Sequence, residues 1–292
     1  MRTFEYHAPQ TIDDALRLLQ AGESARPVAG GTDLVVQMKE RATRFPYPET
    51  IVSLDRVSEL RFIETGGDAL RIGAGATMTD VAADSTVRAH YPALAEGAGV
   101  VGSLQTMNMA TIGGNLCNAA PSADTAPSLL VYGADTVIIG PKGRRTLAIA
   151  DFFRGPGLTA LEPGELLAEL RLSAQPASTG SIYQRNTPRK QMDIAVVGVA
   201  VALTLASDTI ERARVALGAV APTPVRATAA EAALMGQPAT EETFARAAEA
   251  AATEDASPID DVRASAAFRR HLVKVITSRL LVQAAARAKD NR

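Results

Sequence analysis

The chain has 292 residues, of which 47% are hydrophobic and 21% charged, and its 30 basic and 32 acidic side chains leave a formal charge of -2. This length predicts about two domains with real cores, and the ordinary composition argues against disorder. The balanced charge excludes binding to nucleic acid or to an acidic membrane surface. A single cysteine excludes an intrachain disulfide and a four-thiolate iron–sulfur site, so any redox centre must be organic or supplied by a partner, and the expected compartment is cytoplasmic.

No targeting segment or membrane segment is expected. Residues 1–10 lack the basic start and the apolar run of a secretory signal. The longest apolar stretch, 194–205, is interrupted by Gly198 and Thr204 and is shorter than the roughly 18 apolar residues that a membrane helix needs. The sequence therefore predicts no membrane insertion.

Frequent glycine-rich turns in the first half of the chain predict many short elements. Residues 11–19 are expected to form an amphipathic helix, since Thr11 can cap it and acids occupy its first turn. Residues 26–29 predict a buried strand, followed by a helix over 33–39. Further strands are expected at 51–54, 60–64, 69–73, 136–139 and 166–172, with a hairpin turn at 65–68 and helices over 79–84 and 91–99.

The stretch 173–180 is typical of a linker. Beyond it, residues 181–183, 195–205 and 210–217 predict an antiparallel sheet. After Pro222 the chain is rich in alanine, glutamate and arginine, which favours helix. The expected helices are 226–235 ending at Gly236, 241–252 capped by Thr240, and 264–288 with Phe268, Leu272, Val275 and Val282 on one face. The whole chain is predicted to be α+β.

Two similar turns carry the chemical information: Ala29-Gly30-Gly31-Thr32-Asp33-Leu34 and Ile112-Gly113-Gly114-Asn115-Leu116. Two successive residues without Cβ atoms let backbone N–H groups converge on an anion, and a following helix adds its positive end. Two such turns can hold the two phosphates of a pyrophosphate. Neither matches the glycine patterns of nicotinamide or ATP sites, and a lone Gly-Gly is more often an ordinary tight turn.

The second turn continues into residues 115–127, a polar stretch with two prolines. We expect it to be a long loop, and loops of this size in compact domains are usually functional or disordered. Its small residues can line a cofactor, and Asp124 can accept a hydrogen bond from a hydroxyl group.

These residues also carry a resemblance to a known family. The stretches 27–34 and 110–116, the latter continuing to Asp124, resemble the two FAD-binding segments of the flavoprotein (medium) subunit of molybdenum hydroxylases. That family includes carbon monoxide dehydrogenase and xanthine dehydrogenase. A third match, Tyr183-x-Arg185-x3-Arg189-x3-Asp193, resembles the start of the family's C-terminal domain. The resemblance spans nearly the whole chain in order.

The resemblance implies a two-part FAD-binding domain over 1–175, with subdomains at about 1–55 and 56–175, and a C-terminal domain with an antiparallel sheet and helices over 176–292. It also implies a set of FAD contacts. They are Pro27, Val28, Ala29, Gly30, Gly31, Thr32, Asp33, Leu34, Val101, Thr111, Ile112, Gly113, Gly114, Asn115, Asp124, Leu167 and Arg185.

Within this set the resemblance assigns roles. The two glycine turns would contact the pyrophosphate, and Asp124 would contact the ribityl or ribose hydroxyls. Val100 or Val101 would lie beside the isoalloxazine, with Leu167 as another neighbour of the ring. Arg185 occupies a position where some relatives carry lysine near the flavin.

The implied function is that of an FAD-binding electron-transfer subunit of an oxidoreductase complex. A large subunit with a molybdenum cofactor would hydroxylate the substrate, and [2Fe-2S] clusters of a small subunit would pass the electrons through FAD to an external acceptor. The implied assembly is a dimer of heterotrimers. The chain's single cysteine agrees with clusters held by a partner. No catalytic residue and no metal ligand is expected on this chain, and the alternatives are a free-standing flavoenzyme or a cofactor-free assembly subunit.

Other reactive side chains have simpler interpretations. Cys117 has no histidine near it in the sequence and is expected to be a small buried residue. His7, His90 and His271 are scattered and do not predict a metal site. The pair 269–270, two arginines, is expected on a solvated helix face or at a subunit contact.

Overall fold

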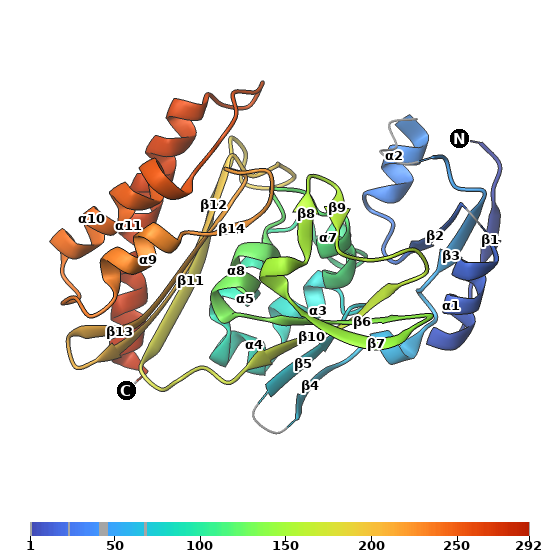
Figure 1. Cartoon of the computed structure of the whole chain (residues 1–292), viewed down its shortest axis with the longest axis horizontal. Helices are drawn as coiled ribbons and strands as arrows, with labels where there is room; N and C mark the ends of the chain where they lie inside the picture. Colours follow the sequence, from blue (N-terminus) through green and yellow to red (C-terminus); the bar gives the residue numbers. More distant parts are fainter. Residues whose placement is uncertain (1, 23, 41–45, 67–68, 292) are drawn as a thin grey trace.

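The computed structural model describes residues 2–22, 24–40, 46–66 and 69–291, and its elements form three units along the long axis of the molecule (Figure 1). A small sheet with helices α1 and α2 stands at one end. A five-stranded sheet and most of the short helices lie in the middle. A four-stranded sheet backed by helices α9, α10 and α11 forms the other end.

The N-terminal unit is a parallel sheet in the order β1-β3-β2, built from β1 (Glu5–His7), β2 (Ala25–Val28) and β3 (Thr50–Ser53). Helix α1 (Ile12–Ala21) begins as predicted after Thr11, whose hydroxyl accepts the N–H of Asp14. Helix α2 (Leu34–Glu40) follows β2, so the first Gly-Gly turn connects a strand to a helix, as predicted.

The middle sheet is antiparallel in the order β4-β5-β10-β6-β7, from β4 (Ile63–Gly66), β5 (Ala69–Gly73), β10 (Leu166–Ser173), β6 (Asp135–Gly140) and β7 (Gly143–Ala148). The strand predicted from Leu60 begins only at Ile63, because Leu60 ends the 3-10 turn η1 (Ser58–Leu60). The sequence does not predict β7, an edge strand whose side chains are exposed or half-buried. Residues 67–68 of the predicted hairpin turn lie outside the described residues.

Short helices and a two-stranded ribbon complete the middle unit: α3 (Met78–Ala83), α4 (Ser85–His90), α5 (Pro92–Ala98), α6 (Leu104–Met107), α7 (Ile112–Cys117), α8 (Thr125–Tyr132), the 3-10 turn η2 (Ile149–Asp151), β8 (Phe153–Gly155) and β9 (Leu158–Thr159). The long loop predicted over 115–127 is wrong, since α7 and α8 occupy its two ends. Pro127 lies in the first turn of α8, where a missing N–H costs no helical hydrogen bond. All residues of α8 are buried, so no polar face reveals the helix in the sequence.

The C-terminal unit is an antiparallel sheet in the order β11-β12-β13-β14, from β11 (Thr179–Asn186), β12 (Val197–Ala206), β13 (Thr209–Gly218) and β14 (Val225–Arg226). The predicted antiparallel sheet is confirmed. Helices α9 (Thr228–Leu234), α10 (Glu241–Ala250) and α11 (Ala266–Asp290) follow, with a π-helical turn, η3 (Ala251–Asp255), and α11 packs along β11 and β12. Gly236 follows α9 with a φ of 72°, and Thr240 caps α10, both as predicted.

The buried face of α11 differs from the predicted one. Phe268 and Val282 are 49% and 44% exposed. The side chains that α11 buries are instead Arg269, Val273, Ile276, Thr277, Leu280, Leu281, Ala284, Ala285 and Ala288. The error arises because apolar side chains lie on more than one side of α11, so their spacing does not single out the contact face.

Arg269 corrects a second expectation, because it is only 4% exposed instead of solvated. Its guanidinium donates to the carbonyl oxygens of Val196 and Ala219 and pairs with Asp261 at 2.8 Å. Arg270 donates to two backbone carbonyls as well. These acceptors compensate the burial of the charge, and they come from segments that the helix pattern cannot reveal.

Candidate functional site

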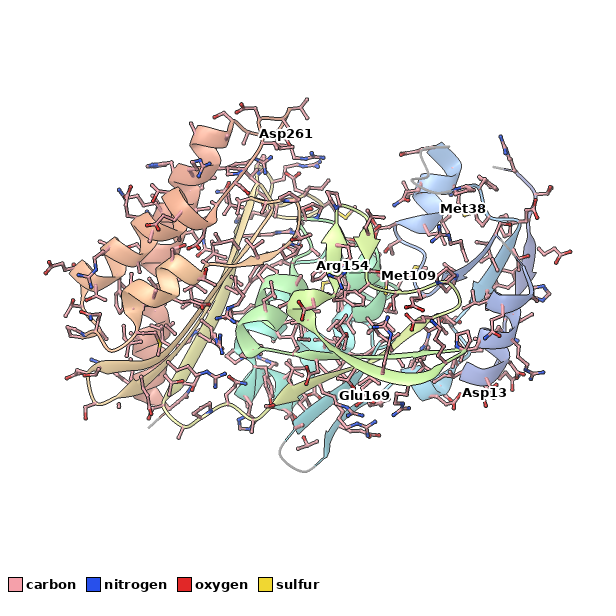
Figure 2. All side chains as sticks on the ribbon, in the orientation of Figure 1. Asp13, Met38, Met109, Arg154, Glu169 and Asp261 are labelled. Carbon is pink, nitrogen blue, oxygen red and sulfur yellow. The ribbon has the colours of Figure 1, made fainter. Side chains whose placement is uncertain are left out.

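The two Gly-Gly pairs lie against each other. The second pair differs from the prediction, since Gly113 and Gly114 lie within the first turn of α7 and do not precede a helix. Gly30 follows β2, and a Cβ atom added to it would lie 1.9 Å from the carbonyl oxygen of Met109, just ahead of the second turn. Figure 2 shows Met109 where the N-terminal unit meets the middle unit. Only glycine permits this approach at position 30. The fold therefore joins the two turns into one seam, which we call the glycine seam (residues 29–34 and 109–115).

In each pair the first glycine packs against backbone and the second does not. Gly113 is buried, and a Cβ atom at this position would lie 2.6 Å from the Cβ of Ala74. Gly114 is exposed, and Gly31 has a φ of 69° with only valine side chains close to it. The second glycines therefore leave the backbone of the seam uncovered by side chains, so that an anion can approach it.

Polar side chains hold the second turn in place. The Thr111 hydroxyl caps α7 by accepting the N–H of Gly114 at 3.0 Å. The Thr125 hydroxyl donates to Oδ1 of Asn115 at 2.7 Å and so links α7 to the start of α8. Because Asp124 immediately precedes Thr125, this bond also fixes Asp124 next to the glycine seam.

The remaining members of the predicted set lie along the same seam or behind it. Pro27 and Val28 are the last residues of β2. In the first turn, Ala29 and Thr32 are half-buried and Asp33 is exposed. Leu34 is the first residue of α2, and the buried Ile112 is the first residue of α7. Leu167 is 4% exposed on β10 and belongs to the same core cluster as Ile112, against which the half-buried Val100 and Val101 also pack.

Asp124 connects the middle unit to the C-terminal sheet. One of its carboxylate oxygens accepts the Tyr183 hydroxyl at 2.7 Å, and the other accepts Nη1 of Arg185 at 2.8 Å. Tyr183 and Arg185 both belong to β11. The side chains of the ion pair are 9% and 6% exposed for Asp124 and Arg185. The structure thus buries a charged pair at the junction of two units.

Burial dominates the protonation chemistry of this group. It raises the pKa of Asp124 to about 6, although the charge of Arg185 and the hydrogen bonds from Tyr183 and Arg185 oppose the rise. Burial, together with the neighbouring Asp124, raises the pKa of Tyr183 well above its ordinary value. Nη2 of Arg185 is buried and has no hydrogen-bond partner among the described residues. A buried guanidinium nitrogen without a partner marks a place for an acceptor atom from outside the chain.

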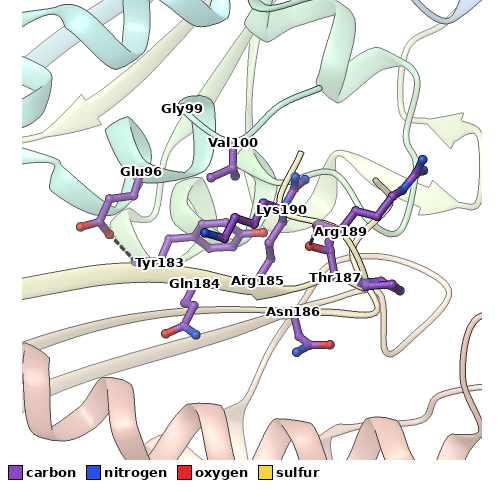
Figure 3. A pocket seen from close by; sticks show the side chains of 11 residues that line it. Glu96, Gly99, Val100, Tyr183, Gln184, Arg185, Asn186, Thr187, Arg189 and Lys190 are labelled. Atoms are coloured by element: carbon purple, nitrogen blue, oxygen red, sulfur yellow. Dashed lines mark hydrogen bonds between the residues drawn. The ribbon is translucent and has the colours of Figure 1, made fainter. Parts of the chain in front are cut away.

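A groove of about 630 Å³ opens beside this pair, between the end of α5 and β11 (Figure 3). It is lined by Glu96, Gly99, Val100 and the run from Tyr183 to Lys190. The Glu96 carboxylate accepts the N–H of Tyr183 at 2.7 Å and pairs with Arg287 of α11 at 2.8 Å. The basic residues on its wall, Arg185, Arg189 and Lys190, favour a negatively charged or electron-rich occupant.

Two residues of this site are missing from the predicted set. Tyr183 stands in the third matching motif, but its sequence context gives it no role. Glu96 lies on a helix far from β11 in the sequence, and only the tertiary contact reveals it. The structure therefore adds Tyr183 and Glu96 as residues that position Asp124 and β11.

Other candidate groups carry no such arrangement. Cys117 is a half-buried free thiol that packs against the middle core, and burial raises its pKa to about 12, so it is not a thiolate near neutral pH. In the part of the chain that the structure describes, no group of three His, Cys, Asp or Glu side chains is placed to hold a metal ion. Within the same residues, no helix combines the length and the apolar character needed to cross a membrane.

Comparison with known proteins covers nearly the whole chain. Residues 2–174 match the FAD binding domain in molybdopterin dehydrogenase, and residues 183–284 match the CO dehydrogenase flavoprotein C-terminal domain. The chain is 36% identical to the xanthine dehydrogenase FAD-binding subunit of Escherichia coli O157:H7, over 97% of this chain and 96% of that one. It is 35% identical to the carbon monoxide dehydrogenase medium chain of Hydrogenophaga pseudoflava, over 97% and 98% of the two chains.

Solved structures agree. The carbon monoxide dehydrogenase of Hydrogenophaga pseudoflava, in a form that lacks the Mo-pyranopterin moiety of its molybdenum cofactor, superposes with a TM-score of 0.93 at 37% identity, covering 98% of both chains. Quinoline 2-oxidoreductase from Pseudomonas putida 86 superposes with a TM-score of 0.92 at 31% identity, covering 98% of each chain.

The fold and the site therefore define an FAD-binding subunit of an oxidoreductase. More narrowly, the chain belongs to the flavoprotein (medium) subunits of the molybdenum hydroxylases, the family of the carbon monoxide and xanthine dehydrogenases. The predicted family, the α+β fold class and FAD as the cofactor are confirmed.

Proposed function

We propose that this chain is the electron-exit subunit of a molybdenum hydroxylase. When bound, FAD supplies the redox chemistry, taking electrons from [2Fe-2S] clusters of a small partner subunit and giving them to an external acceptor. Substrate hydroxylation then belongs to a large partner subunit with the molybdenum cofactor. The supporting relatives are named medium chains or FAD-binding subunits, and their names include carbon monoxide and xanthine dehydrogenase. A dimer of such heterotrimers in the cytoplasm is the proposed assembly.

The observation that carries this proposal is the meeting of the two glycine turns at Gly30 and Met109. It supports a single pyrophosphate site at the glycine seam, with Gly31 and Gly114 as its uncovered glycines. Because the N–H groups of Gly113 and Gly114 already donate to Ala74 and Thr111, the N–H groups of the first turn are proposed as the donors to the phosphates. The seventeen residues of the predicted set are proposed as the FAD contacts, in a domain over 1–175 followed by a C-terminal domain over 176–292.

The residues near Asp124 fit the other parts of the cofactor. Arg185 would help to hold bound FAD by donating from its unpartnered Nη2, and its positive charge would favour electron uptake by the cofactor. Asp124 stays ionised at neutral pH beside Arg185 and holds that guanidinium in place. The protein thus binds, orients and tunes the cofactor, and no side chain of this chain is needed to move a proton for electron transfer.

Loss of flavin from glycine variants tests the seam. We expect Gly31→Val and Gly114→Val to purify folded but colourless, because the added side chains cover the backbone that faces the phosphates. Gly236→Val is the matched control, since Gly236 has a φ of 72° close to the 69° of Gly31 and its added Cβ atom would have open space. Normal FAD content in both seam variants, measured by absorbance after heat release, contradicts the proposed site.

Purification of the native complex separates the alternatives. Co-purification with a cysteine-rich chain and a larger molybdenum-containing chain supports the proposal. An active chain isolated without molybdenum or iron would instead identify a free-standing flavoenzyme. A chain that FAD neither binds nor stabilises would identify an assembly subunit.

A further inference from the structure

A second groove, of about 310 Å³, lies at the other edge of the C-terminal sheet. Strand β11, which carries Arg185, is one edge of that sheet, whereas the second groove lies along β13 beside the short β14. We call it the arginine groove. Its walls are Arg212, Ala213 and Arg214 from β13 and Thr228, Glu231, Ala232 and Met235 from α9 and its end.

The carboxylate in the arginine groove is already fully used. Glu231 pairs with Arg226 through two hydrogen bonds, one of them 2.6 Å long, and it also accepts the N–H of Val215 at 2.9 Å. In contrast, the side chains of Arg212 and Arg214 form no hydrogen bond and no ion pair with any residue that the structure describes. The groove therefore carries three arginines near a single carboxylate, and Glu231 forms its ion pair with Arg226.

The two free arginines lie on one face of one strand. They alternate along β13 with the buried Ala213 and Val215, so they share the opposite face, about 7 Å apart along the strand. Both are half-buried. Burial and then the nearby charge of Arg226 lower the pKa of Arg214, Glu231 opposes the fall, and Arg212 adds to it. The two positive charges repel each other at this distance, whereas an anion bound between them would attract both.

The backbone around the groove excludes an added peptide strand. At one end β13 is paired with β14 through Ala216 and Leu217. At the other end Ile210 donates to the carbonyl of Gln237 and accepts the N–H of Gly236. With both ends of the free edge closed, a chain cannot run along it by β-augmentation, so the space suits a small molecule.

We propose that the arginine groove binds the phosphate group of a small molecule, with Arg212 and Arg214 donating to its oxygens. Two guanidinium groups match the charge of a phosphate dianion, and their planar forks suit its oxygens. The volume of the arginine groove is near the lower limit of the volumes of small-ligand sites. The site is separate from the FAD contacts and does not depend on the proposed electron-transfer route.

Calorimetric titration of the FAD-loaded protein tests the proposal, because bound FAD keeps phosphate out of the glycine seam. The probes are inorganic phosphate, glucose 6-phosphate and acetate, at constant ionic strength. We expect saturable binding of a phosphate probe, with binding weakened at least tenfold in the Arg212→Gln/Arg214→Gln double variant, since each lost charge-assisted hydrogen bond costs about a factor of ten. The Arg144→Gln/Arg279→Gln variant removes the same charge from exposed positions and should bind like the parent protein.

The order of affinities for the three probes identifies the ligand class or overturns the proposal. Tighter binding of glucose 6-phosphate than of inorganic phosphate supports a phosphorylated metabolite as ligand, and the reverse order supports free phosphate. Equal binding of acetate, equal weakening in the control variant, or no saturable binding of either phosphate overturns the proposal. FAD absorbance, recorded on the same samples, should be unchanged in all variants, so that a failure here is distinct from a failure of the FAD site.

Discussion

Removal of the cation that pairs with Asp124 should destabilise the junction of the middle unit and the C-terminal sheet. In an Arg185→Leu variant, the carboxylate of Asp124 remains buried and keeps only the hydrogen bond from Tyr183. Breaking a buried ion pair from one side costs about 3–5 kcal/mol. We expect a loss of this size in the free energy of unfolding at pH 8, where Asp124 must either stay ionised without its partner or take up a proton.

The cost should be smaller in acid. Because burial raises the pKa of Asp124 from 3.8 to about 6, the folded protein binds this proton more tightly than the unfolded chain. The contribution of Asp124 to the free energy of unfolding of the parent protein therefore falls as the pH rises from about 4 to 6. Without Arg185 the pKa rises further and the fall continues to higher pH. At about 1.4 kcal/mol per pKa unit, the substitution should cost about 2–3 kcal/mol less at pH 5 than at pH 8.

Urea unfolding of the FAD-free chain measures these free energies. Far-UV circular dichroism is the signal, because the chain contains no tryptophan. The Arg185→Leu/Asp124→Asn double variant is the control, since it leaves no unpaired charge and should regain most of the lost stability at pH 8. Tyr183→Phe leaves the ion pair intact and should cost about 1.5–3 kcal/mol, the value of a hydrogen bond to a charged group. Equal costs of Arg185→Leu at pH 5 and pH 8, or a double variant as unstable as the single one, would contradict a stabilising ion pair between Asp124 and Arg185.

Three further predictions follow from other contacts. Hydrogen bonds from Arg71, and then those from Arg171, lower the pKa of Glu169 from 4.5 to about 2 against the effect of burial. The stabilisation by Glu169 is therefore complete above about pH 4.5 and is lost between pH 4.5 and 2. An acid titration of the free energy of unfolding should show a loss of about 2–3 kcal/mol that Glu169→Gln abolishes. Gly30→Ala should destabilise the chain by about 1–3 kcal/mol and lower its FAD content, because the new Cβ atom overlaps the Met109 carbonyl; unchanged melting and flavin content would contradict the seam. Glu96→Gln should cost about 1 kcal/mol in urea unfolding and less at high salt, since its pair is partly exposed; no change on added salt would argue against an ionic contribution.

Local chemistry in the sequence predicts the elements that are amphipathic or capped. Thr11 and Thr240 cap the helices where the pattern places them, and Gly236 ends α9 as expected. Two of the failures share one cause. Helix α8 is buried all round and β7 is an exposed edge, so neither shows the alternation of apolar and polar residues on which such predictions depend.

The two glycine pairs show what the sequence can predict and what it cannot. Their composition is enough to predict an anion site and, with the resemblance, the family and FAD. It does not distinguish the glycines within each pair. Gly30 and Gly113 are required because backbone or a neighbouring Cβ approaches them, whereas Gly31 and Gly114 leave backbone uncovered. That difference depends on contacts between segments far apart in the chain.

The same holds for the charged groups. Composition and local patterns predict the α+β architecture and the need for a partner to supply any iron–sulfur cluster. The glycine motifs predict FAD only through the family resemblance that they carry. Only the tertiary structure decided that Asp124 meets Arg185, that Glu96 holds β11 and that Arg269 is buried. Charge and burial act through space, so the partner that neutralises a buried group is fixed by the packing of distant elements, which periodicity along the chain does not encode.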